Sequence, residues 1–206
     1  MSLRLYYFHD PMCSWCWAFR PLWKKIVANL PDYVSDQRVL GGLAPDTDQA
    51  MPQDMQAKLR GIWQKIQQTV PGTQFNFEFW EKCSPRRSSY AACRAVIAAR
   101  RQDPRHEENM ILAIQRAYYL EARNPADRST LIELAHEIGL DGERFTRELD
   151  NPDTHQALLE EVELTRRLDV KGFPTLLMEK RGVFTPIQLD YGNVENVLHQ
   201  IKLLSQ

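Results

Sequence analysis

Two cysteines, Cys13 and Cys16, stand three positions apart in the segment PMCSWCWAFRP of residues 11–21. On a helix such positions lie on neighbouring turns, so the two thiols can approach closely enough to form a disulfide. A pair of this kind can be a redox dithiol, half of a zinc site, or two core thiols without chemistry. The elements that position the pair decide among these uses.

A short buried strand is predicted directly before the cysteines and a helix directly after them. The aromatic run LRLYYF at residues 3–8 is typical of a central strand in a parallel sheet. The helix should begin near Cys13, carry a kink at Pro21 and end at residues 29–31. A second strand is expected over residues 37–45, which completes a βαβ unit with a parallel strand pair.

A helix that begins at Cys13 places this thiol at the positive end of the helix dipole. Backbone N–H groups of the first turn, which lack helical partners, can also donate to the sulfur. Both effects favour the thiolate, the form that attacks disulfides. Cys16 should lie one turn deeper and be less exposed. We therefore interpret Cys13 as the nucleophile and Cys16 as the thiol that resolves the mixed disulfide.

The zinc alternative needs four ligands. The remaining cysteines, Cys83 and Cys93, are ten residues apart, which is unlike a zinc knuckle. Cys93 also falls on an apolar helical stripe with Val96 and Ile97, which is typical of a core position. We expect both cysteines to be plain thiols, with a structural disulfide between them as the alternative, and we expect no metal.

A second signal lies near the other end of the chain, in the segment VKGFPTLL of residues 170–177. Gly-Phe-Pro directly before a strand predicts a cis peptide bond at Pro174. Such a bond would present the backbone of Phe173 as an edge on which an extended peptide could dock beside the reactive sulfur. The coincidence with the paired cysteines favours this interpretation over an ordinary trans loop.

The middle of the chain is expected to be helical. Helices are predicted over residues 48–68, over three segments between Ser88 and Gly139, and over residues 154–168; the last of the three segments should be capped at Ser129. Two strands, at residues 174–180 and 183–189, and a final amphipathic helix follow. This order predicts one mixed sheet built by the two ends of the chain, with the helices inserted between them.

Four features of the chain are shared with one known family. They are the strand followed by Asp10-Pro11-x-Cys13-Ser14-Trp15-Cys16, the helical block after the second strand, the segment LIELAHEIGLD…F of residues 131–145, and Val170-x-Gly172-Phe173-Pro174-Thr175. On these features the chain resembles the DsbA-like family of the thioredoxin superfamily. Within that family it is similar to the cytoplasmic branch of FrnE-like proteins or predicted protein-disulfide isomerases.

The resemblance implies an α/β protein, a thioredoxin fold with a large all-helical insertion. The expected domains are a discontinuous thioredoxin-like domain of residues 1–45 and 152–206 and a helical insertion, or lid, of residues 46–151. The resemblance also implies the roles of Cys13 and Cys16 given above, with a cis proline beside them.

Further candidates surround the dithiol. Trp15 should be exposed and contact substrate together with Phe173 and Pro174, whereas Trp17 should pack under the lid. Asp10 is expected either to close an Asx turn before the helix or to handle protons or contact substrate.

His9 and Ser14 are further candidate modulators of the thiols. The periplasmic oxidases of the family carry Pro-His between their cysteines, whereas this chain has Ser-Trp, so the redox direction stays open.

The predicted function is a thiol–disulfide oxidoreductase or isomerase acting on protein or small-thiol disulfides. A dithiol carries two electrons by itself, so no metal or organic cofactor is expected. The recycling reductant or oxidant is not identified. Two other classes compete: a redox-sensing adaptor of DsbA-like fold that delivers a partner to a protease, and an isomerase like the kappa glutathione transferases. The second usually has serine at the first thiol position, which argues against it here.

Composition limits the remaining classes. The net charge of −1, with 43% hydrophobic and 26% charged residues, is typical of a globular protein and gives no strong field toward nucleic acid or membrane. The arginine-rich segment of residues 86–105 is expected to be a solvated helix face. No apolar run approaches the roughly 18 residues of a membrane span, and MSLRLYYFHD does not resemble a signal peptide, which favours the cytoplasm.

Overall fold

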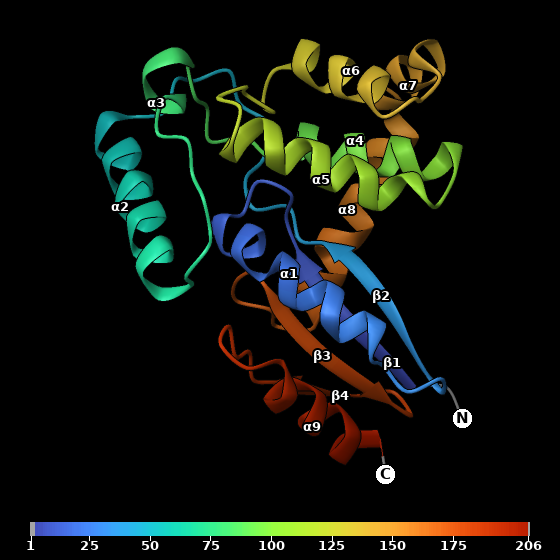
Figure 1. The fold of residues 1–206 in the computed structure, drawn as a ribbon. Coiled ribbons are helices and arrows are strands. Elements are labelled where there is room, and N and C mark those ends of the chain that lie inside the picture. The colour runs from blue at the N-terminus through green and yellow to red at the C-terminus, as the bar shows by residue number, and fades with distance from the viewer. Residues whose placement is uncertain (1–2, 206) are drawn as a thin grey trace.

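The two ends of the chain build one sheet in the computed structural model, which describes residues 3–205 (Figure 1). The strand order is β2-β1-β3-β4. Strand β1 runs parallel to β2 and antiparallel to β3, and β4 is antiparallel to β3. The mixed sheet predicted from the sequence is therefore confirmed. The strands are β1 (Leu3–His9), β2 (Val34–Leu40), β3 (Thr175–Lys180) and β4 (Val183–Ile187).

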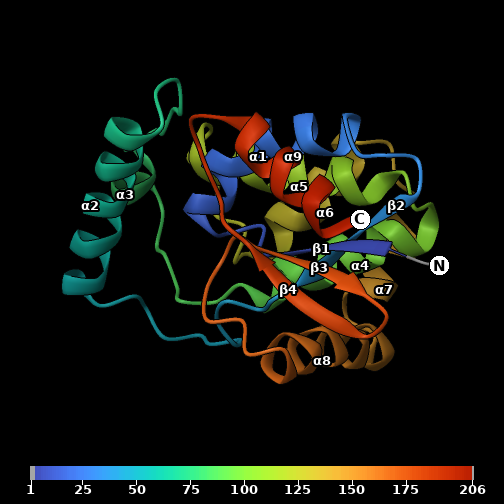
Figure 2. The same ribbon diagram turned by 90° about the horizontal axis from the view of Figure 1, so that it is seen from below.

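Side chains of β1 alternate between the two faces of the sheet, and helices cover both faces. Leu5 and Tyr7 point into a core with helices α1 (Ser14–Ala28) and α9 (Val194–Ser205). Phe8 lies on the opposite face, in a smaller cluster that helix α8 (Pro152–Arg167) covers. Figure 2 shows α1 and α9 on one side of the sheet and α8 on the other.

The residues between β2 and α8 are mainly helical. Helices α4 and α5 pack closely because α4 presents a row of buried alanines to its neighbours. Helices α2 and α3 surround a separate aromatic cluster centred on Trp63 and stand to one side of the molecule (Figure 1). The helices are α2 (Gln53–Thr69), α3 (Phe79–Lys82), α4 (Tyr90–Gln102), α5 (His106–Tyr119), α6 (Arg128–Glu137) and α7 (Gly142–Leu149).

Several predicted boundaries are wrong. The second strand occupies residues 34–40 rather than 37–45, because the chain turns at Gly41-Gly42, where Gly42 has φ +62. Helix α2 begins at Gln53 rather than at residue 48. Helix α6 has Asp127 at its N-cap rather than Ser129.

Two short helices, α3 and α7, were not predicted. Helix α7 spans only eight residues and buries Phe145 and Leu149, four positions apart. Two apolar positions are too few to establish a helical period.

The arginine-rich segment of residues 86–105 is not a freely solvated face. Most of its arginines form ion pairs, and several of these side chains are largely buried. The carboxylates neutralise the guanidinium groups, so the segment does not concentrate positive charge. The pairs are Arg86–Asp127, Arg94–Asp46, Arg100–Glu161, Arg101–Glu148 and Arg105–Asp103.

The division into a thioredoxin-like domain of residues 1–45 and 152–206 and an insertion of residues 46–151 stays a prediction. Residues 1–2 and 206, at the outer ends of the first domain, lie outside the described part of the chain. Among the described helices, none is both long and apolar enough to span a bilayer.

Candidate active site

Cys13 occupies the N-cap of α1, as the sequence predicts within one residue. Its backbone is extended (φ −85, ψ 118), and its carbonyl accepts the first hydrogen bond of the helix from Trp17 N at 3.0 Å. The Cys13 side chain is 7% exposed and that of Cys16 is fully buried, so the expected order of exposure is confirmed. Both are free thiols. Burial raises the pKa of the Cys16 thiol well above its usual value.

The segment around Pro174 directly precedes β3, the neighbour of β1, and contacts Cys13 in the loop after β1. The Cys13 Sγ donates to the carbonyl oxygen of Phe173 at 3.4 Å, and the Phe173–Pro174 peptide bond is cis, as predicted. The ring of Phe173 packs away from the sulfur, directly over Gly41. A Cβ at Gly41 would come within 1.9 Å of the ring, so only glycine allows this approach. The backbone of Phe173 thus faces the thiol, while its ring anchors the loop.

Asp10 is completely buried and holds three segments together. One carboxylate oxygen accepts from Met12 N at 2.8 Å, which is the predicted Asx turn. The other accepts from Leu43 N at 2.7 Å, from Ser89 Oγ at 2.7 Å and from Cys93 Sγ at 3.5 Å. Burial raises the pKa of Asp10, and its hydrogen bonds counteract that rise. Asp10 therefore ties the cysteine loop to the end of β2 and to α4.

His9 is also buried, on the other side of the loop. Its ring stacks on that of Tyr7 with a centroid distance of 4.9 Å. Burial, reinforced by the nearby charges of Arg38, Arg100 and Arg20, lowers the pKa of His9 to about 3. The imidazole is therefore neutral at physiological pH.

Tyr7 was missed by the sequence analysis. It lies on the same face of β1 as His9 and lines a small cavity together with Cys16, and burial raises its pKa. The signal was present in the sequence. A strand alternates its faces, so Leu3, Leu5, Tyr7 and His9 all point toward the helix that carries the cysteines.

Trp15 is half-buried, so the expectation of an exposed ring is wrong. It packs edge-on against Tyr191, with ring centroids 5.4 Å apart. Trp17 is also half-buried, stacks on Tyr119 of α5, and donates from Nε1 to the Gln74 carbonyl at 3.0 Å. This contact with the helical part agrees with the predicted packing of Trp17 under the lid. Ser14 is the first residue of α1 and is half-buried.

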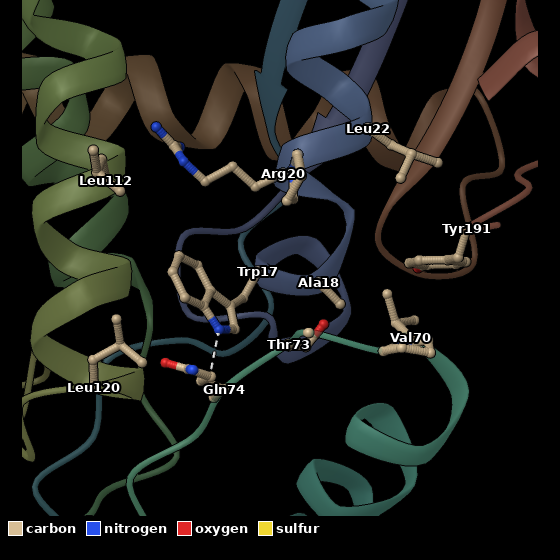
Figure 3. Close-up of a pocket in the computed structure, with 13 residues that line it drawn as sticks. Trp17, Ala18, Arg20, Leu22, Val70, Thr73, Gln74, Leu112, Leu120 and Tyr191 are labelled. Carbon is tan, nitrogen blue, oxygen red and sulfur yellow. Dashed lines mark hydrogen bonds between the residues drawn. The ribbon is translucent and has the colours of Figure 1, made fainter. Parts of the chain in front are cut away.

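A cavity of about 470 Å³ lies beside the first turns of α1. Figure 3 shows Trp17 on one side of the cavity and Tyr191 on the other, next to Val70, with Thr73 and Gln74 below. Most of the lining is apolar. The cavity is therefore suited to an apolar group, with the Thr73–Gln74 backbone as its polar edge. Its further lining residues are Arg20, Pro21, Leu22, Pro71, Gly72, Leu112 and Leu120.

The other two cysteines lie apart from this chemistry. Cys93 is a buried core residue, as its apolar stripe predicts, and its thiol donates a hydrogen bond to Asp10. Cys83 is half-buried and donates to the Ala122 carbonyl at 3.1 Å. Both are free thiols, so the alternative of a structural disulfide does not hold here. Within residues 3–205, no group of three or more His, Cys, Asp or Glu side chains could hold a metal ion.

Comparisons with known proteins identify related chains across this architecture. A family model described as thioredoxin matches residues 6–183. A candidate protein disulfide isomerase from Nitrosomonas europaea superposes with a TM-score of 0.84 at 26% identity, covering 99% of this chain and 97% of that one. The cytosolic disulfide reductase DsbM from Pseudomonas aeruginosa, also solved with GSH, gives 0.75 at 26% identity, covering 98% and 96%. A probable DsbA oxidoreductase from Streptomyces coelicolor shares the fold.

The curated relatives are named as adapter proteins and not as oxidoreductases. The ClpXP adapter protein SpxH from Halalkalibacterium halodurans is 27% identical over 85% of this chain. The match spans 58% of the length of that relative. The DsbA-like resemblance and the thioredoxin fold are confirmed by these comparisons.

Proposed function

Because the chain belongs to the thioredoxin family, we propose that it is a thiol–disulfide oxidoreductase whose nucleophile is Cys13 and whose resolving thiol is Cys16. One observation carries this proposal: Cys13 is the N-cap residue of α1, its sulfur lies against the Phe173 carbonyl, and Cys16 lies one turn further into the helix. The sulfur therefore lies at the N-terminal end of the helix, where the backbone N–H groups of the first turn have no helical partners. No other described pair of cysteines has such a place in the fold.

The reaction balances without a cofactor. The Cys13 thiolate attacks a substrate disulfide, which forms a mixed disulfide and releases one substrate thiol. Cys16 then attacks the Cys13 sulfur and releases the second thiol, whose sulfur takes up the proton that Cys16 loses. The substrate gains two electrons and the dithiol becomes a disulfide. An external thiol reductant would return it to the reduced form.

The surroundings of Cys13 suit a peptide or a small thiol. The Phe173 carbonyl next to the sulfur offers a backbone acceptor to an extended segment. The cavity lined by Trp17 and Tyr191, one turn of α1 beyond Cys13, would take an apolar side chain, and Trp15 packs against its Tyr191. The reductive direction and a glutathione-type recycling thiol are supported by the likeness to a cytosolic disulfide reductase that has been solved with GSH. The same likeness to a cytosolic protein favours action in the cytoplasm.

The test is the reduction of insulin disulfides with glutathione as electron donor. We expect the wild-type protein to accelerate the reaction and Cys13→Ser to reduce the rate to background. Cys83→Ser is the matched control, because it removes a half-buried thiol elsewhere and should retain the full rate. Equal rates for wild type and Cys13→Ser would overturn the proposal.

A second candidate function is favoured by the curated relatives, which are named adapters. In that role the fold would bind a partner protein and deliver it to a protease, with the dithiol sensing redox state. The same variant separates the two candidates. An adaptor would keep its partner bound in Cys13→Ser and show no turnover in either form.

A further inference from the structure

A second, very small cavity lies directly behind Cys16. It encloses about 10 Å³, close to the least volume that one water molecule occupies. Four elements meet there, namely β1, α1, β2 and α5. Its lining residues are Tyr7, His9, Cys16, Arg20, Trp23, Arg38, Glu108, Ile111 and Gln115.

Three buried nitrogen atoms in this lining lack a hydrogen-bond partner within residues 3–205. They are His9 Nε2, Trp23 Nε1 and Arg38 Nε. Buried polar atoms without partners are rare and costly, and three residues that carry such an atom line this one cavity, which points to a ligand. Apolar contents would leave all three unsatisfied.

The three atoms are chemically complementary to one molecule. Indole Nε1 and guanidinium Nε can only donate, whereas a neutral imidazole with its proton on Nδ1 offers Nε2 as an acceptor. The ligand must therefore accept two hydrogen bonds and donate at least one. Water does this and has one further O–H to give. Within the described lining, Cys16 supplies the sulfur that can receive it.

We propose that this cavity binds one water molecule, which accepts from Trp23 and Arg38, donates to His9, and directs its second O–H at the Cys16 sulfur. The water stabilises the Cys16 thiolate during the resolving step, because a hydrogen bond to the charged form favours that form. It neither gains nor loses a proton. The proton of Cys16 ends on the leaving thiol, as in the reaction above. This inference rests on the proposed function.

The charged groups around the cavity do not replace this hydrogen bond. Arg20 pairs with Glu108 at 2.5 Å, and Arg38 contacts Glu108 at 3.4 Å, so carboxylates from α5 offset the nearest cations. Burial raises the pKa of Cys16, and the neighbouring Cys13 thiol raises it further. A water O–H directed at the Cys16 sulfur is then the specific interaction that favours the thiolate. The titratable and charged groups around Cys16 and His9 are Tyr7, Asp10, Cys13, Arg20, Arg38, Arg100, Tyr119 and Tyr191. The carboxylates that pair with these arginines are Glu107, Glu108 and Glu161.

His9, Trp23 and Arg38 are thus positioning residues, and their role is tested in a single turnover of the reduced protein with oxidised glutathione. Formation and resolution of the mixed disulfide are followed separately by quenched-flow mass spectrometry. Trp23→Phe removes one N–H from the cavity, and we expect it to slow resolution about tenfold and to move its pH profile upward by about one unit. Formation at Cys13 should keep its rate.

Two further variants separate the water from general damage. His9→Gln places an amide oxygen near Nε2 and should resolve within about threefold of the wild type, whereas His9→Phe should behave like Trp23→Phe. Trp80→Phe is the matched control, because Trp80 Nε1 is also buried without a partner in the described chain but lies in the α2–α3 cluster. It should leave both steps unchanged.

The outcomes are distinct. Equal slowing of both steps in Trp23→Phe and His9→Phe, or no slowing, overturns the inference. A wild type that forms no mixed disulfide at Cys13 overturns the proposed function instead. A crystal structure of the reduced protein checks the site itself: one water within about 3.2 Å of all three nitrogens is expected, and an empty or apolar-filled cavity contradicts it.

Discussion

His9 and Asp10 are consecutive residues and equally buried, at 1% and 0% exposed, yet their surroundings are opposite. The Asp10 carboxylate accepts hydrogen bonds from Met12, Leu43, Ser89 and Cys93. The His9 Nε2, in contrast, has no partner in the described chain and faces a cavity. A buried polar group whose hydrogen bonds are all made within the protein fixes the shape of a loop. A buried polar group without a partner can bind a ligand.

The two sides also differ in what they join. Asp10 connects the cysteine loop to β2 and α4 by direct contacts, so it should matter for folding. His9 lies among arginines and carboxylates of α1, β2 and α5, next to the resolving thiol, so it should matter for the second step of the reaction. The variants below test this division.

The largest effect is expected for Asp10→Ala. The substitution leaves several buried donors without an acceptor, which should lower the free energy of unfolding by about 3–5 kcal/mol. Asp10→Asn keeps one acceptor oxygen and should cost about half as much. Urea denaturation followed by circular dichroism measures both. A loss below about 1 kcal/mol in Asp10→Ala would show that the carboxylate does not hold the loop.

A smaller loss is expected for Glu108→Gln, on the His9 side. Glu108 offsets Arg20, whose side chain is 9% exposed, so the change leaves a largely buried cation without its counter-charge. We expect a loss of about 2–3 kcal/mol. Asp150→Asn breaks an ion pair of the same type with Arg128, but there both side chains are more than half exposed, and it should cost less than about 1 kcal/mol. Equal losses in the two variants would contradict the buried network.

The effect that is smallest near neutral pH is a pH dependence of stability that His9 causes. Its pKa is about 3 in the fold and about 6.5 in the unfolded chain, so between these values only the unfolded chain binds the proton. The contribution of His9 is fully present above pH 6.5 and is lost as the pH falls toward 3, with a slope of at most about 1.4 kcal/mol per pH unit. His9→Phe should lack this part of the slope in denaturation curves across that range. A slope unchanged from wild type would mean that His9 can take up a proton in the fold.

Much of this architecture could be predicted because its signals are local. Cys13 and Cys16 stand between a strand and a helix, and Gly-Phe-Pro precedes a later strand, so the sequence placed both sides of the dithiol. The mixed sheet followed from the order of elements. Helix α7 was missed because two apolar residues define no period.

The cavity behind Cys16 could not be predicted, because it depends on contacts between distant residues. Arg20 of α1 pairs with Glu108 of α5, 88 positions away in the sequence, and Arg38 of β2 contacts the same carboxylate. No sequence motif indicates that these three residues lie together. The alternation of β1 could have placed Tyr7 and His9 on the face of α1, but not their neighbours.

The central claim is that Cys13 attacks the substrate disulfide, and trapping the mixed disulfide tests it most directly. Cys16→Ser cannot resolve this intermediate, so incubation with oxidised glutathione should load one glutathione onto the protein. Peptide mapping by mass spectrometry should find it on Cys13, with Cys83 and Cys93 unmodified. Glutathione on Cys83 instead, or no adduct in Cys16→Ser, would contradict the account.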